Sequence, residues 1–213
     1  MRPWYWLAWS LSGTFFKSVC HAEIQGRDLL PTSNFLAVSN HLSNLDPPLA
    51  GWALEREIYY LAKKTLWNNP TMGKLITSLN SIPVDQERPE MTSLKKIIKV
   101  LREGHNAIIF PEGSRSMDGK LQPGLPGAGL VAIKAQVPIV PMRIFGTFEA
   151  LPPGGKNFVP HPIRVIIGKP FYPPPEAEAK GDKTHYEALS KLMMDRIAAL
   201  EWDHGGYADK PIV

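Results

Sequence analysis

Residues 35–46 read FLAVSNHLSNLD, and residues 106–116 read NAIIFPEGSRS. In each stretch an apolar run of strand length ends in a cluster of polar, titratable side chains. Short apolar runs bounded by turn-forming residues are typical of buried strands. In open α/β sheets, sites form just beyond the carboxyl ends of such strands. The two stretches therefore predict an α/β fold with polar groups gathered at one edge of its sheet.

The rest of the chain alternates strand-like and helix-like segments. Further apolar runs of strand length occupy residues 58–62, 81–84, 138–142 and 163–168, and apolar residues recur at helical spacing over 91–101 and 189–200. This alternation favours a single α/β domain with a largely parallel or mixed central sheet flanked by helices. Proline cannot donate a ladder hydrogen bond. Because Pro138 and Pro141 lie in one run, we expect that run to be an edge strand or an irregular one.

The N-terminal segment is unusually rich in aromatic residues. Residues 3–16 read PWYWLAWSLSGTFF, which as a helix would span about 21 Å, short of the roughly 30 Å hydrocarbon core of a bilayer. Indole rings prefer the headgroup level of a membrane. We therefore expect an interfacial membrane helix with three contacts, namely Trp4, Trp6 and Trp9. A helix docked on the protein's own core is the alternative.

Composition limits the partners and the compartment. The 213 residues include 24 Lys and Arg against 20 Asp and Glu, a formal net charge of +4. This mild excess favours anionic partners, and no zinc-finger spacing or long basic arm points to nucleic acid. Cys20 is the only cysteine, which excludes an internal disulfide and favours a reducing compartment. We expect a membrane-surface helix over residues 1–22, a catalytic domain over 23–213, and a peripheral or monotopic location on the cytoplasmic face of a membrane.

Asn40-His41 and Asp46 form an N-H-x4-D pattern. Histidine suits a general base at neutral pH because its ordinary pKa is about 6.5, and a carboxylate on its second nitrogen fixes the tautomer. A separation of five residues does not match one helical face. The pattern fits if His41 ends a strand and Asp46 opens the next helix. Asp46 is also a good N-cap, with Leu49 as its donor after two prolines.

The FPEGSRS stretch offers groups for an anionic substrate. Arg115 can hold a phosphate bidentately, and Gly113 allows backbone to approach a ligand closely. Glu112 can accept hydrogen bonds from substrate hydroxyls or position Arg115 from behind. A polar surface loop with an ordinary Glu–Arg pair is the alternative. Ser114 lacks the G-x-S-x-G context of a hydrolase nucleophile, and no metal or nucleotide motif occurs, so we expect no metal and no cofactor.

These motifs resemble those of the glycerolipid acyltransferases, which include the 1-acylglycerol-3-phosphate (lysophosphatidic acid) type. NHLSNLD at 40–46 and FPEGSRS at 110–116 are similar to the first and third motifs of that family, IPVD at 82–85 to the second and VPIVPM at 137–142 to the fourth. The resemblance implies transfer of a fatty acyl group from acyl-CoA or acyl carrier protein to the free hydroxyl of 1-acylglycerol-3-phosphate. The product would be phosphatidic acid, made in phospholipid biosynthesis.

The resemblance also implies roles for individual residues. His41, held by Asp46, would take the proton of the acceptor hydroxyl as that oxygen attacks the thioester, with no acyl-enzyme. Glu112 and Arg115 would bind the glycerol-phosphate part. The expected substrate-binding residues are Asn40, Arg88, Glu112, Gly113, Arg115 and Lys120. A membrane lipid surface would be the remaining partner.

Two departures from the family pattern keep the acceptor open. Gln86 stands where an Arg commonly follows the second-motif Asp85, and Leu125-Pro126 precedes Gly127 in place of a basic residue. Phosphate recognition would then rest on Arg115 with Arg88 or Lys120, or the head group differs. Alternative acceptors are glycerol-3-phosphate, a lyso-ornithine lipid or another lysophospholipid. An acyl thioesterase and a non-catalytic lipid-binding protein are the alternatives from other classes.

Overall fold

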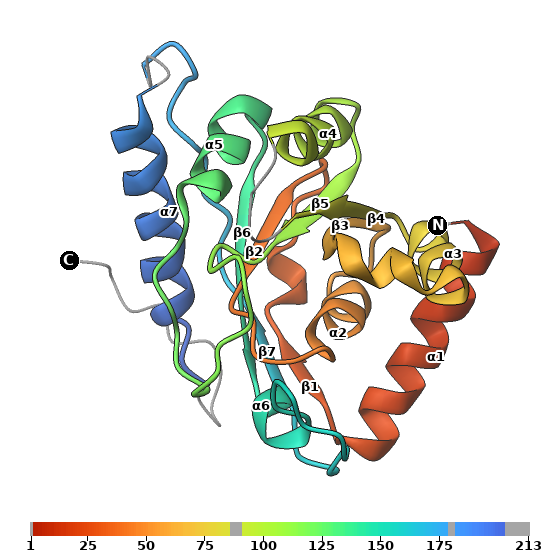
Figure 1. Ribbon diagram of the computed structural model, residues 1–213. Coiled ribbons are helices and arrows are strands. Elements are labelled where there is room, and N and C mark those ends of the chain that lie inside the picture. Colours follow the sequence, from red (N-terminus) through yellow and green to blue (C-terminus); the bar gives the residue numbers. More distant parts are fainter. Residues whose placement is uncertain (1, 86–90, 179–181, 203–213) are drawn as a thin grey trace.

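A mixed sheet of seven strands runs through the computed structural model, which describes residues 2–85, 91–178 and 182–202 (Figure 1). The strand order is β1-β7-β6-β2-β5-β3-β4. The strands are β1 (Glu23–Gln25), β2 (Leu36–Ser39), β3 (Ile58–Lys63), β4 (Ser81–Val84), β5 (Asn106–Ile109), β6 (Ile139–Phe145) and β7 (Arg164–Ile167). The α-helices are α1 (Pro3–Val19), α2 (Asp46–Ala53), α3 (Pro70–Ser78), α4 (Met91–Arg102), α5 (Pro126–Ala135), α6 (Thr147–Ala150) and α7 (Lys183–Ala198), with 3-10 helices η1 (Arg27–Leu29) and η2 (Lys64–Asn68).

Most of the sheet is parallel. Strands β6, β2, β5, β3 and β4 all run in one direction. Strand β7 pairs antiparallel with β6, and the short β1 pairs parallel with β7. The predicted α/β class with a largely parallel or mixed sheet is confirmed. Five neighbouring parallel strands place their carboxyl ends at one edge, which is where the motif residues fall.

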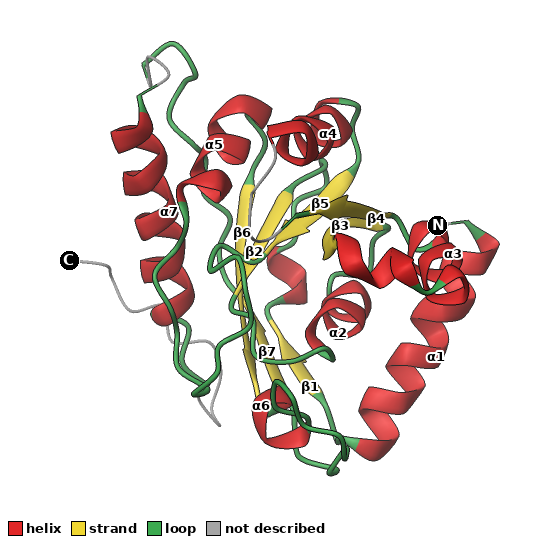
Figure 2. Cartoon of the chain, viewed as in Figure 1, coloured by secondary structure: helices red, strands yellow, loops and turns green. Residues whose placement is uncertain are grey.

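Helices cover both faces of the sheet (Figure 2). Alternate side chains of a strand point to opposite faces. In β2, Leu36 and Val38 join the core that α4, α5 and α7 contribute to, whereas Ala37 joins the core of α1 and α2. Because both faces are covered, the central strands β2 and β5 are apolar except at their ends, where Ser39 closes β2 and Asn106 opens β5. The titratable motif residues His41 and Glu112 therefore lie in the loops at the carboxyl ends of β2 and β5.

The prediction that the run at 138–142 forms an edge strand is wrong. Strand β6 lies inside the sheet, between β2 and β7. Met142 pairs with Ile167, the last residue of β7, so Pro141 lies opposite Gly168 at the end of that ladder. The carbonyl of Pro141 still accepts from the Gly168 N–H at 2.8 Å. The proline therefore costs the sheet a single terminal hydrogen bond.

Helix α1 docks on the body of the domain along one face. Tyr5, Gly13 and Phe16 are buried, and Phe16 belongs to the core that α2 shares. A Cβ on Gly13 would lie 2.2 Å from the indole nitrogen of Trp52, so only glycine permits this packing. The opposite face is exposed and still apolar. No helix among the described residues is long and apolar enough to cross a membrane.

Candidate active site

The motif residues meet at the carboxyl edge of four adjacent strands. His41 follows β2, Glu112 follows β5, Lys63 ends β3 and Asp85 follows β4. Since β2, β5, β3 and β4 are neighbours and parallel, all four loops leave the sheet on the same side. This is the edge at which α/β proteins commonly bind ligands.

His41 and Asp46 form a tight pair. The His41 Nδ1 lies 2.8 Å from Asp46 Oδ2, and the same oxygen accepts the backbone N–H groups of Leu42 at 2.6 Å and Ser43 at 2.7 Å. Asp46 is fully buried, whereas the imidazole is 15% exposed. Because an ionised carboxylate only accepts, Nδ1 carries the proton and Nε2 is left as the acceptor. This is the state that a general base requires.

Asp46 is not the N-cap that the sequence predicted. Leu45 is the N-cap, and Asp46 is the first residue of α2. The N–H of Leu49 bonds to the Leu45 carbonyl at 3.1 Å rather than to the carboxylate. The next two residues are prolines without N–H groups, so the nearest free donors lie behind Asp46, in the turn after His41. The carboxylate therefore points back toward that turn and accepts the N–H groups of Leu42 and Ser43.

An aromatic ring fixes the orientation of the imidazole. The rings of His41 and Phe110 stack with centroids 4.1 Å apart and planes 17° apart. Phe110 directly follows β5, so the sheet itself sets the position of the ring. Asp46 and Phe110 together leave His41 little rotational freedom, which preorganises Nε2.

Glu112 is buried against the His41 turn. Its Oε1 accepts the backbone N–H of His41 at 3.1 Å, and the N–H of Ser116 donates to the His41 carbonyl at 2.8 Å. Burial, with a smaller contribution from the charge of Asp46, raises the pKa of Glu112 to about 7 against the lowering effect of the N–H groups of His41 and Gln122. The structure thus joins the two motif loops on both sides of His41.

The alternative of an ordinary surface Glu–Arg pair does not hold. No ion pair joins Glu112 and Arg115 among the described residues. Glu112 is only 6% exposed, whereas Arg115 is partly exposed. The carboxyl thus faces the protein and leaves the guanidinium free to bind an anion from outside.

The other predicted substrate-binding residues lie in different places. Gly113 has φ +75° and lines the cavity beside His41. Lys120 is exposed on the loop before α5. Asn40 is buried, and its amide bonds both the N–H and the carbonyl of Ile144, at 2.8 and 2.9 Å. Its side chain ties β2 to β6 and is not free to bind substrate, which corrects that prediction. Arg88 lies outside the described residues.

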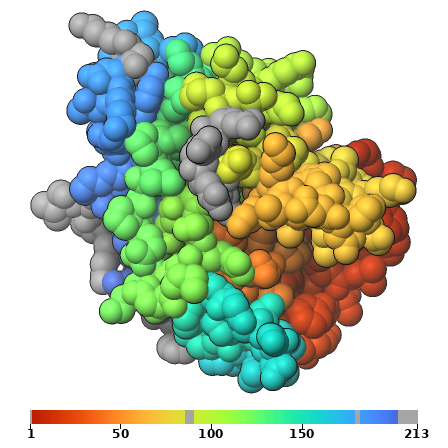
Figure 3. Space-filling view, viewed as in Figure 1, coloured from red at the N-terminus to blue at the C-terminus, as the bar shows by residue number. Residues whose placement is uncertain are grey.

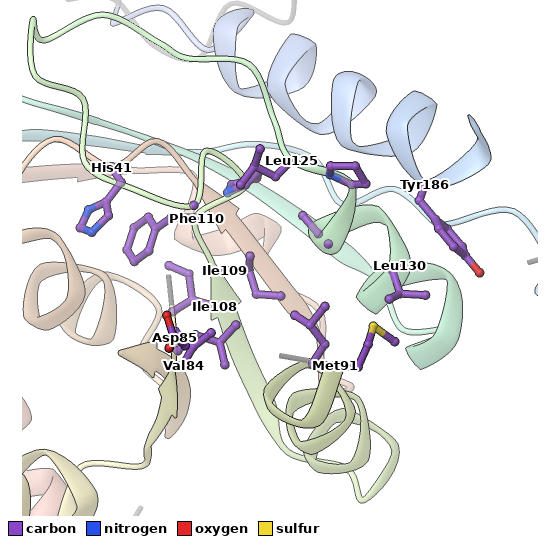
Figure 4. A pocket seen from close by; sticks show the side chains of 17 residues that line it. His41, Val84, Asp85, Met91, Ile108, Ile109, Phe110, Leu125, Leu130 and Tyr186 are labelled. Atoms are coloured by element: carbon purple, nitrogen blue, oxygen red, sulfur yellow. The ribbon is translucent and has the colours of Figure 1, made fainter. Parts of the chain in front are cut away.

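An apolar cavity of about 430 Å³ opens beside His41 (Figure 4). His41 and Phe110 lie at one end, and Met91, Leu130 and Tyr186 lie at the other. The remaining lining residues are Leu61, Val84, Asp85, Leu94, Ile108, Ile109, Pro111, Gly113, Leu125, Pro126, Gly127 and Ala128. The sequence does not reveal this cavity because its lining comes from six separate elements. In a sequence, an apolar residue that lines a cavity cannot be distinguished from one that packs in the core.

One wall of the cavity is a rigid pair of helices. The Ser190 hydroxyl of α7 donates to the Leu125 carbonyl at 2.8 Å and accepts the Gly129 N–H at 2.9 Å. A Cβ on Gly129 would lie 2.1 Å from the carbonyl oxygen of Tyr186, so α5 and α7 approach backbone to backbone. Leu130 and Tyr186 are thus held at a fixed separation.

A parallel α/β sheet with a His–Asp pair at the mouth of an apolar cavity suits transfer of an acyl group. A family model described as Acyltransferase matches residues 21–145, and the chain belongs to that family. It is 34% identical over 175 residues to the chloroplastic 1-acyl-sn-glycerol-3-phosphate acyltransferase BAT2 of Brassica napus, covering 80% of this chain and 49% of that protein. It is 31% identical over 182 residues to the 1-acyl-sn-glycerol-3-phosphate acyltransferase of Bacillus subtilis, covering 84% of this chain and 87% of that one.

A solved structure shares the fold. The 1-acyl-sn-glycerophosphate acyltransferase PlsC from Thermotoga maritima superposes with a TM-score of 0.73 at 26% identity, over 93% of this chain and 81% of that one. The chain spans about half the length of the plant relatives that it matches, BAT2 among them. The resemblance drawn from the first and third motifs is confirmed.

Proposed function

We propose that this protein transfers a fatty acyl group from acyl-CoA or acyl carrier protein to the free hydroxyl of 1-acylglycerol-3-phosphate, forming phosphatidic acid. One observation carries the proposal: a histidine whose Nδ1 is held by a carboxylate lies at one end of an apolar cavity and lines it. The names of the relatives support the choice of acceptor.

His41 acts as the general base. Its Nε2 takes the proton of the acceptor hydroxyl as that oxygen bonds to the thioester carbon. The carbon–sulfur bond then breaks, and the thiolate leaves and recovers a proton from the imidazolium. A free thiol has a pKa of about 8.5, so the leaving group needs little assistance. Asp46, buried 2.8 Å from Nδ1, stabilises the imidazolium while it exists. The steps balance without a covalent enzyme intermediate or a cofactor.

The acyl chain of the donor occupies the cavity. Most of the lining side chains are aliphatic or aromatic, and burying a methylene group in such surroundings contributes about 0.8 kcal/mol. With the chain between β5 and α5, the thioester carbonyl lies at the His41 end. Arg115 does not line the cavity. It therefore receives the phosphate of the acceptor outside, on the open side of the site.

Helix α1 attaches the enzyme to the cytoplasmic face of a membrane. Trp4, Leu7, Leu11 and Phe15 recur every three or four residues and form one exposed stripe. Trp6 is exposed as well, whereas Trp9 is partly covered by the protein. An exposed apolar stripe opposite a docked face suits partial burial at a headgroup layer. Both substrates carry acyl chains, so this placement brings them to the site.

Product analysis tests the proposal. The purified protein would be incubated with a labelled acyl-CoA and a panel of lysophospholipids, glycerol-3-phosphate and a lyso-ornithine lipid. A diacyl product that depends on 1-acylglycerol-3-phosphate and disappears in His41→Ala is the expected result. Free fatty acid as the sole product would identify a thioesterase instead. If acyl-CoA fails with every acceptor, and acylated carrier protein fails too, the proposed transfer is wrong.

A further inference from the structure

Exposed apolar side chains gather in three elements. Fourteen large apolar side chains are exposed in the described part of the chain, and nine of them belong to α1, η2 and α3. The three elements together hold only 31 residues, so the concentration is not a matter of size. In α1 the exposed side chains are the stripe described above together with Trp6 and Val19. The rest of the group is Leu66 of η2 with Met72 and Leu75 of α3.

Helix α3 buries little of its own apolar surface. Gly73 is its one buried residue, while Met72 and Leu75 are 42% and 41% exposed. The helix is held instead by local bonds, with Asn69 capping its start and Trp67 Nε1 donating to the Thr77 hydroxyl at 2.9 Å. A helix that shows its apolar residues to solvent needs another apolar phase to cover them.

The charged residues of the same elements are all cationic. Helices α1, η2 and α3 contain Lys17, Lys64 and Lys74 and no Asp or Glu, while Arg2 just before α1 pairs with Glu57. Lys17, Lys64 and Lys74 make no ion pair among the described residues. A second copy of this surface would meet it with like charges, which disfavours self-association. An anionic bilayer offers both an apolar layer and opposite charge.

The elements lie side by side. Trp4 Nε1 of α1 donates to the Ser78 hydroxyl of α3 at 2.9 Å, and Arg2 bonds the Ser78 carbonyl at 3.5 Å. Figure 3 shows α1 in red adjoining η2 and α3 in orange and yellow on one flank of the molecule. Helix η2 starts where β3 ends, at the edge of the sheet that carries His41.

We propose that η2 and α3 form, together with α1, a single docking surface for an anionic phospholipid bilayer. Leu66, Met72 and Leu75 enter the acyl boundary, and Lys64 and Lys74 contact headgroup phosphates. The surface then reaches from α1 to the catalytic edge, so a lysophospholipid passes from the bilayer to His41 without crossing water. The inference rests on the proposed membrane attachment, and it adds a second contact and a preference for anionic lipid.

Vesicle binding of the full chain tests this contact. Met72→Gln/Lys74→Gln/Leu75→Gln removes two exposed apolar side chains and one charge. The matched control, Tyr172→Gln/Lys191→Gln, removes an exposed ring and one charge beyond the three elements. With vesicles of phosphatidylcholine and phosphatidylglycerol, we expect the α3 variant to bind about tenfold more weakly than wild type. The control should bind as wild type, and pure phosphatidylcholine should bind all three less well.

A fluorescent label reports burial directly. Cys20 is the only cysteine and is fully buried, so a dye sensitive to its environment can be placed on Leu75→Cys alone. We expect a blue shift with the mixed vesicles at position 75 and none at Tyr172→Cys. If the protein sediments with vesicles but position 75 does not shift, the second contact is refuted while the α1 attachment stands. Failure of wild type to bind any vesicle would refute both, and acyl transfer in detergent micelles would be judged separately. A dimer that forms through the labelled face would also overturn the lipid assignment.

Discussion

The backbone N–H of His41 donates to Oε1 of Glu112 at 3.1 Å. The carboxyl group of the FPEGSRS loop thus fixes the backbone of the proposed general base. Ser116 completes the link on the carbonyl side of His41 at 2.8 Å. His41 and Glu112 are 71 residues apart in sequence, yet their two loops form one structural unit. A change in either loop is therefore expected to displace the imidazole.

Loss of the base should abolish transfer while sparing the fold. His41→Ala removes the proposed acceptor of the hydroxyl proton, and we expect turnover to fall about 10²- to 10⁴-fold. Asp46→Asn keeps the shape but loses the charge that stabilises the imidazolium, and we expect a fall of similar order. Initial rates and circular dichroism on the same preparations check both. Near-normal turnover in His41→Ala would exclude the assignment.

Glu112 should make stability depend on pH. The unfolded carboxyl releases its proton near the ordinary pKa of 4.5, and the folded one near 7. Between these values the unfolded state binds fewer protons, so rising pH favours unfolding. The contribution is fully present below pH 4.5 and lost by about pH 7, roughly 3 kcal/mol in all.

Glu112→Gln isolates this effect, since the amide keeps an acceptor for the His41 N–H and cannot ionise. The difference in unfolding free energy between wild type and variant should change by roughly 3 kcal/mol from pH 4 to pH 8, in favour of the variant at high pH. Urea denaturation at both pH values measures it. A difference that does not vary with pH would show that Glu112 titrates normally.

Arg115 should govern affinity for the acceptor. A bidentate guanidinium–phosphate contact contributes about 1.5–3 kcal/mol, so Arg115→Ala should raise the acceptor KM about 10- to 100-fold with little change for the donor. Lys120→Ala is the comparison. Because its ammonium is exposed, we expect a KM change below about fivefold. An effect of Arg115→Ala confined to the donor KM would contradict the phosphate role.

The depth of the cavity should set the preferred acyl length. Leu130 lies at the end of the cavity far from His41. Leu130→Trp should shorten the space and lower kcat/KM for long-chain donors more than for medium-chain donors. Val159→Trp adds the same ring at an exposed position and should leave the preference unchanged. Competition between a long-chain and a medium-chain donor in one reaction measures the ratio of their kcat/KM values. An equal fall in kcat/KM for both donors would place the acyl chain outside this cavity.

The stripe on α1 can be tested without removing the helix. Deleting α1 would uncover the core around Phe16, so surface changes are cleaner. Leu7→Gln/Leu11→Gln alters two exposed side chains, 42% and 63% accessible, and should weaken sedimentation with vesicles about tenfold. Thermal unfolding should stay within about 1 kcal/mol of wild type, because neither side chain packs on the core. Unchanged sedimentation would refute the attachment.

The sequence was sufficient for the class of fold and for the groups at the sheet edge. His41 and Asp46 could be paired because a strand end and a helix start bring residues five apart together. The direction of the Asp46 carboxylate could not be predicted, since it depends on which backbone donors the turn leaves unpaired. The burial of Glu112 was likewise invisible, because it requires the β2 and β5 loops to be neighbours.

Long-range arrangement accounts for the remaining misses. Pro141 argued for an edge strand, but a proline is tolerated inside a sheet where its neighbour has just ended. Strand β1, at three residues, is too short to stand out from the sequence around it. Asn40 looked like a substrate ligand because it precedes His41, and only the position of Ile144 shows where its amide is used.

The backbone contact between Gly129 and Tyr186 has a consequence for how this enzyme can diverge. The Ser190 hydroxyl of α7 bonds the Leu125 carbonyl and the Gly129 N–H at the start of α5, so sliding the two helices past each other would break both bonds. With the acyl chain in the cavity as proposed, a different chain is accommodated most simply by exchanging single side chains such as Leu130, because remodelling this wall requires several changes at once. Selectivity in such an enzyme should evolve in discrete steps of chain length.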